Sequence, residues 1–139
     1  MEHKQASRII VTCVPDAERL AFLPRHFGRQ MLIVERAVYA HLGNLCADYR
    51  GGLWNFFDLS NGGCYLAPSE SRGYQLLVEG NGFCGKFDAE CAGIVATLFA
   101  LSHLSIRFPD QDRLAERFYQ LRNFACEHPD GNLILAAID

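Results

Sequence analysis

The residue whose type and position come closest to those of a catalytic group is Cys91. Asp88, three residues earlier, can cap a helix, so Cys91 is expected in the first helical turn, where the positive end of the helix dipole favours a thiolate. The residues from 91 to 106 are almost wholly apolar, and cysteine is among the residue types most often buried. A nucleophile and a small core residue are both open interpretations, and the core residue is favoured.

Histidine is the usual base beside such a thiol, but the sequence pairs none of its histidines with Cys91. His26 stands out, because it follows Pro24 and Arg25 in a segment expected to be a loop, where polar side chains more often bind partners. Three others are expected on helices, where they border the core or stabilise a helix end: His41, His103 and His128.

Motifs for metals, phosphates and bases are missing from the sequence. No Cys-x-x-Cys or His-x-x-x-His pair occurs, so we expect no metal site and no cofactor. The glycine turns at 60–63 and 80–82 lack the spacing of phosphate-binding loops, and hairpin turns explain them. Aromatic residues between 54 and 87 could stack bases, but basic residues are nearly absent there, so core packing is favoured.

Helices are expected where apolar residues recur at helical spacing between capping and breaking residues. Asp16 can cap a short helix that Pro24 closes, which leaves Arg25 and His26 in the loop that follows. Asp88 begins an apolar helix that belongs inside the protein. The other helices are expected over residues 30–49, from Pro109 to just before Pro129, and over residues 133–138.

Strands are expected in the middle of the chain, where apolar residues alternate on either side of Asn-Gly turns. They cover residues 54–59, 64–67, 74–78 and 83–87. These segments predict an α+β fold, a small antiparallel β-meander of about four strands packed with several α-helices. The chain shows no linker or repeat, so residues 1–139 are expected to form a single domain.

Length and charge exclude several classes of protein. A chain of 139 residues, 50% of them hydrophobic, can build a core without metals or disulfides. Its net charge of −3 is too small for a mimic of DNA, and the sign argues against a general nucleic-acid coat. No stretch approaches about 18 consecutive apolar residues and no signal peptide is present, so we expect a cytoplasmic protein with free thiols and no membrane partner.

Several strings of the sequence occur in an order and spacing typical of one family. They comprise residues 20–28, 45–49 with Tyr39, 54–68, 80–83, 92–101, 128–129 and 136–139. Together they resemble the ArdB/KlcA antirestriction proteins of bacterial plasmids and mobile elements. Three residues depart from the family pattern: Phe57 and Asp58 stand where Tyr-Glu is often found, and Cys64 where an aromatic residue is common.

This resemblance implies a compact α+β protein that relieves restriction by type I restriction-modification systems and leaves modification largely intact. It implies an inhibitor and not an enzyme. The small net charge favours contact with the type I restriction-modification complex, or with a host factor controlling it, over acidic DNA mimicry, and no stable nucleic-acid binding is expected. The alternatives are a small enzyme that depends on Cys91 or a histidine, and a weak DNA-binding module.

Candidate interaction residues are the polar positions in these strings that secondary structure alone does not require. Arg25 and His26 come first, as a loop pair able to donate hydrogen bonds to a carboxylate or phosphate. The others lie at or near hairpin ends or at the last residue: Asn55, Asp58, Asn61, Asn81 and Asp139. We expect the hairpin residues to cluster on one side of the sheet, while turn chemistry and a frayed terminus are the competing explanations.

Overall fold

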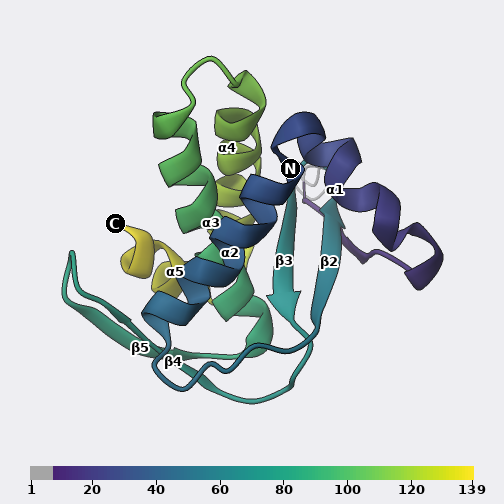
Figure 1. Ribbon diagram of the computed structural model, residues 1–139. Helices are drawn as coiled ribbons and strands as arrows, with labels where there is room; N and C mark the ends of the chain where they lie inside the picture. Colours follow the sequence, from purple (N-terminus) through teal and green to yellow (C-terminus); the bar gives the residue numbers. More distant parts are fainter. Residues whose placement is uncertain (1–7) are drawn as a thin grey trace, which may run out of the picture.

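Five α-helices and five β-strands make up residues 8–139, the part of the chain that this computed structural model describes (Figure 1). In chain order they are β1 (Val11–Cys13), α1 (Arg19–Phe27), α2 (Met31–Leu45), β2 (Trp54–Leu59), β3 (Cys64–Pro68), β4 (Tyr74–Val78), β5 (Phe83–Phe87), α3 (Ala89–Arg107), α4 (Asp112–Glu127) and α5 (Gly131–Ile138). The α+β class is confirmed, and so are the four strands expected in the middle of the chain.

The strands are divided between two antiparallel sheets, one with the order β1-β2-β3 and one formed by β4 and β5. The two expected hairpins therefore do not continue into one another as a single meander. Pro68 ends β3 and cannot donate a hydrogen bond to a further ladder, while β4 buries Tyr74, Leu76 and Val78 and packs against α2 and α3. The first sheet gains its third strand from β1, where Val11 pairs with Leu59.

Helix α3 forms the centre of the protein and lies between α2 and α4 (Figure 1). Asp88 caps it as expected, since its Oδ1 accepts the backbone N–H of Cys91 at 2.8 Å. The helix is long and apolar enough to cross a membrane, but most of its apolar residues are buried in the protein core. Gly93 allows it to approach β3, because a Cβ there would lie 2.3 Å from the Leu66 carbonyl oxygen.

The expected end of the first helix at Pro24 is wrong. Asp16 belongs to a short 3-10 turn without a side-chain cap, and α1 continues through Pro24 to Phe27. Proline is tolerated here because the acceptor it leaves unused would be the carbonyl of Leu20, a residue that is 95% exposed to water. The helix instead ends at Gly28, whose φ of 52° suits glycine.

Candidate interaction site

Three of the expected interaction residues meet where the last turn of α1 contacts the end of β2. Arg25 Nη1 and Nη2 donate to Asp58 Oδ1 and Oδ2, both at 3.2 Å, in a bidentate ion pair. His26 Nε2 lies 2.6 Å from Asp58 Oδ1. The expectation that Arg25 and His26 form a loop pair is wrong, because both lie on α1, and the helix positions them.

The protonation state of His26 follows from its two neighbours. Arg117 on α4 donates from Nε to His26 Nδ1 at 3.1 Å, so Nδ1 is the acceptor and Nε2 carries the proton that is donated to Asp58. Burial lowers the pKa of His26, the hydrogen bond with Asp58 opposes this, and the positive charge of Arg117 adds to the lowering. The imidazole is therefore neutral at physiological pH.

Asp58 is the anion at the centre of this cluster. Burial by itself would raise its pKa, but the hydrogen bonds from Arg25 and His26 outweigh that effect and hold the pKa below its ordinary value. The Arg25 side chain is 48% exposed and that of Asp58 is 32% exposed, whereas His26 is buried. Arg25 and Asp58 thus present a fixed pair of opposite charges to solvent. His26 holds the Asp58 carboxylate from the buried side.

The same network extends along α4 to the turn between β2 and β3. Arg117 Nη1 donates to Gln120 Oε1 at 3.0 Å, and Gln120 Nε2 donates to the Asn61 carbonyl, also at 3.0 Å. Asn61 Nδ2 donates in return to the Gln120 carbonyl at 2.9 Å. Gly63 is needed at this contact, since a Cβ there would lie 2.8 Å from Gln120 Cβ. The turn is thereby fastened to the helix.

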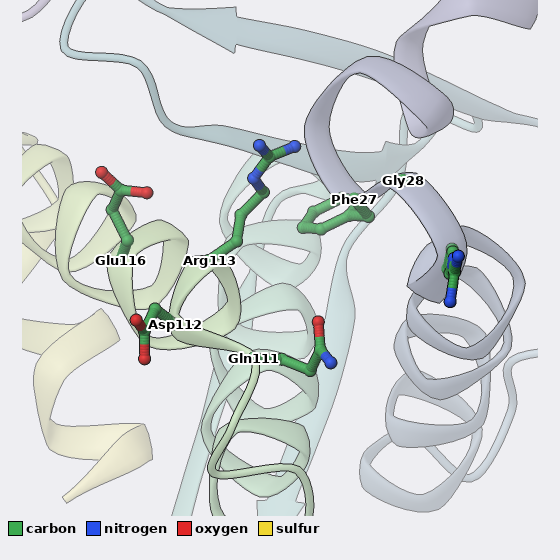
Figure 2. Close-up of a pocket in the computed structure, with 7 residues that line it drawn as sticks. Phe27, Gly28, Gln111, Asp112, Arg113 and Glu116 are labelled. Carbon is green, nitrogen blue, oxygen red and sulfur yellow. The ribbon is translucent and has the colours of Figure 1, made fainter.

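A pocket of about 480 Å³ lies beside this network, between the end of α1 and the start of α4 (Figure 2). Figure 2 shows Asp112, Arg113 and Glu116 projecting from α4, with Phe27 and Gly28 at the end of α1 opposite them. Arg113 connects the pocket to the network through long hydrogen bonds of 3.4 Å from Nη1 to the carbonyl oxygens of the last turn of α1. The pocket is polar and carries both signs of charge.

The remaining expected residues lie outside the network, so the hairpin residues do not all gather on one side of a single sheet. Asn81 lies in the β4–β5 turn of the other sheet, where Nδ2 donates to the carbonyl of Ala137 at the end of α5 at 3.0 Å. Asn55 is half-buried within β2, opposite Ala67. Asp139 follows α5 and lines a separate pocket with His103 and other residues.

The contribution of α4 to this network is not evident from the sequence. A polar helix face usually contacts water, but Arg117 on the face that also carries Arg113 and Gln120 is only 14% exposed and contacts His26. The spacing of four and three residues between them places these side chains on one face of the helix. That stripe is the only signal in the sequence, and it does not say which element the face will meet.

The thiol of Cys91 does not have the surroundings of a nucleophile. Burial raises its pKa, and the carboxylates of Asp88, Asp130 and Glu90 raise it further, so the thiol is protonated at neutral pH. His128 Nε2 lies 4.0 Å from Sγ, but it also lies 3.1 Å from Glu90 Oε1. The interpretation of Cys91 as a buried residue is confirmed, with an exposed fraction of 1%.

Known proteins of similar sequence show the class of protein to which this chain belongs. The model of a family described as antirestriction protein matches residues 47–139. The antirestriction protein KlcA of Escherichia coli is 46% identical, covering 96% of this chain and 95% of its own, and a second KlcA from the same species is 44% identical over 97% and 98%. The chain therefore belongs to the ArdB/KlcA family of antirestriction proteins.

A solved structure gives the same result for the fold. It is a structure from the KlcA and ArdB proteins, which are described as showing a novel fold and antirestriction activity against type I DNA restriction systems in vivo but not in vitro. Its TM-score with this chain is 0.88 at 43% sequence identity, and the match covers 94% of this chain and 95% of that one. The resemblance seen in the sequence is confirmed.

Proposed function

We propose that this chain is a cytoplasmic protein that relieves type I restriction by contact with another protein. Membership of the antirestriction family supports the activity, and the activity of the KlcA and ArdB proteins against type I systems supports the target. The proposed contact surface consists of Arg25, Asp58 and the adjoining pocket, and we call it the Arg25–Asp58 surface. Asn61 supports it through α4.

The observation that carries this proposal is the held but accessible ion pair of Arg25 and Asp58. Both side chains are partly exposed, and buried His26, which Arg117 holds in turn, fixes the position of the carboxylate from the other side. Charged groups that are already oriented lose little freedom when a partner binds. Arg25 also offers a planar group suited to bidentate contact with a carboxylate of a partner protein.

The charges of this surface favour a protein partner over imitation of DNA. Its basic and acidic groups balance one another: Arg25, Arg29 and Arg113 stand beside Asp58, Asp112 and Glu116. A mimic of DNA presents a dense row of negative charges, as the phosphate backbone does. A mixed surface instead recognises one complementary protein surface.

The partner we infer is the restriction complex as it exists in the cell, or a host factor that controls it. The KlcA and ArdB proteins act in vivo but not in vitro, which favours a component that purified assays lack. The Cys91 thiol is buried and protonated, so we infer binding as the mode of action and no enzymatic step.

The test is the plating efficiency of unmodified phage on bacteria with a type I system, with and without this chain, while methylation of the surviving DNA is followed. Arg25→Ala should lose the relief of restriction that the unaltered chain provides. Arg36→Ala is the matched control, because Arg36 is an exposed arginine on α2. Unchanged plating with the unaltered chain at good expression would contradict the proposed activity, and equal activity of both variants would contradict the proposed surface.

A second experiment separates the modes of contact. Capture of the chain from restricting cells, followed by identification of the bound proteins, should recover restriction subunits or a host protein that depends on Arg25. Gel-shift assays with modified and unmodified duplexes should show no stable complex at moderate salt. Tight binding of DNA with a steep salt dependence would favour the DNA-binding alternative.

A further inference from the structure

A second cluster of chemically active side chains lies at the start of α3, away from the Arg25–Asp58 surface. Glu90 and Cys91 belong to the first turn of this helix, whereas His128 and Asp130 belong to the connection between α4 and α5. Metal-ligating atoms of Glu90, Cys91 and His128 all lie within 4.8 Å of one another. Spacing along the chain does not reveal this cluster, because His128 is separated from Cys91 by 37 positions and from Glu90 by 38.

The distances within the cluster are close to the edges of a tetrahedral metal site. His128 Nε2 lies 3.1 Å from Glu90 Oε1, and Cys91 Sγ lies 4.0 Å from His128 Nε2 and 3.7 Å from Asp130 Oδ2. Zinc bound to sulfur, nitrogen and oxygen at its usual distances of about 2.0–2.3 Å separates its ligands by about 3.3–3.7 Å. Shifts of a few tenths of an ångström would bring Glu90, Cys91 and His128 to that geometry, whereas Asp130 groups with Asp88 on the other side of the thiol and has further to move.

The charge around the cluster also favours a cation. Asp88, Glu90 and Asp130 surround the thiol, and within residues 8–139 no lysine or arginine forms an ion pair with any of them. The helix N-terminus opposes a cation with only about half an elementary charge. Two carboxylates and a thiolate would therefore outweigh it.

Two neighbouring hydrogen bonds affect the ligands: one orients Glu90 for metal binding, and the other, to His128, must break. Tyr65 donates from its hydroxyl to Glu90 Oε2 at 2.7 Å, which leaves Oε1 directed at His128. His128 Nδ1 accepts the backbone N–H of Asp130 at 3.0 Å. A metal on Nε2 would move the imidazole proton to Nδ1, so this backbone contact must open when the metal binds. A pocket of about 210 Å³ lined by Glu90 and His128 provides access.

We propose that Glu90, Cys91 and His128 form a binding site for one Zn²⁺ ion, which Asp130 beside the thiol completes as the fourth ligand when it turns towards the ion. The combination of a cysteine and a histidine with carboxylates selects zinc over magnesium or calcium, which prefer oxygen ligands alone. Once Asp130 has closed the fourth position, the site is of the structural type. The metal ties the first turn of α3 to the α4–α5 connection, and so holds α5 against the core.

The test is a calorimetric titration of Zn²⁺ into the full chain, prepared without an affinity tag and stripped of metal with a chelator. One ion should bind per chain and raise the thermal midpoint. Cys91→Ser and His128→Gln should each weaken the affinity for Zn²⁺ at least about tenfold. Replacing a residue that only contacts a metal ligand already causes a loss of that size, so replacing a ligand should cause no less. Co²⁺ in place of Zn²⁺ should give the absorption bands of tetrahedral thiolate coordination, and the Asp130 amide resonance should shift.

Two matched variants serve as controls. Cys84→Ser removes an exposed cysteine on β5, and His103→Gln disrupts the pair of imidazoles formed with His41, which could also bind a metal. Both should keep the affinity of the unaltered chain. The proposal is overturned if Zn²⁺ does not bind, if binding is lost in His103→Gln, or if the Co²⁺ spectrum lacks thiolate bands. The last readout applies to the unaltered chain and so does not depend on the folding of any variant.

Discussion

The imidazole Nε2 of His26 lies 2.6 Å from Oδ1 of Asp58, and this contact joins the last turn of α1 to the end of β2. Arg117 holds the other ring nitrogen, so the histidine connects three elements that are distant in sequence. The exposed partner of Asp58 is Arg25. The roles are therefore divided: His26 positions the carboxylate, and Arg25 offers the group that a partner can reach.

Arg25→Ala should abolish relief of restriction while it changes the free energy of unfolding by less than about 1 kcal/mol. Partly exposed ion pairs contribute little to stability, because water screens them and the arginine loses freedom when it is held. Urea unfolding followed by circular dichroism, measured beside the plating assay, separates the two effects. A large loss of stability would mean that the loss of function reports on folding.

His26→Ala should lower the free energy of unfolding by about 2–3 kcal/mol, because it leaves a cavity and removes the hydrogen bonds to Asp58 and Arg117. His26→Gln should lose less, since an amide can donate to Asp58 and accept from Arg117. Chemical denaturation of both variants provides the measurement. Equal losses would show that these hydrogen bonds contribute little, and that packing dominates at this position.

Acidification should destabilise the protein through His26. Its pKa in the folded state is below the ordinary value of 6.5, so as the pH falls through about 6.5 the unfolded chain takes up a proton before the folded chain does. Stability is therefore complete above that pH and is lost as the pH falls towards the folded pKa. Asp58 adds a second loss at lower pH, since its folded pKa lies below 3.8.

The measurement for this effect is the free energy of unfolding at about pH 7 and about pH 5.5. His26→Gln should show a smaller loss between the two than the unaltered chain does. His41→Gln is the comparison. Burial and then His103 lower the pKa of His41 as well, so His41 contributes its own part of the loss of stability between the two pH values. An unchanged pH dependence in His26→Gln would contradict a neutral imidazole in the folded protein.

Gly93→Ala should destabilise the protein by at least about 2 kcal/mol, because the added methyl group would meet the backbone of Leu66 and Ala67 within 2.4 Å. Gly80→Ala is the control, since a Cβ at Gly80 has no neighbour within 4 Å. It should change stability by less than about 0.5 kcal/mol. Thermal unfolding of both variants tests the prediction, and a stable Gly93→Ala would mean that α3 can move away from β3.

Local sequence features were sufficient for much of the fold. Alternation around Asn-Gly turns identified β2 to β5, and Asp88 identified the start of α3, because turns and caps depend on neighbouring residues. The end of α1 was not predictable in this way. Pro24 usually ends a helix, and it is accepted here because the carbonyl it leaves without a donor belongs to exposed Leu20.

The candidate site also was predictable from the sequence only in part. The sequence alone identified Arg25, His26, Asp58 and Asn61 as polar residues that turns and strands do not require, and the family to which the chain belongs. Only the tertiary structure decided that α4 completes their network and that Cys91 meets His128. Helix and turn formation depend on local contacts, whereas the partner of an exposed helix face depends on how distant segments pack, and no spacing in the chain encodes that directly.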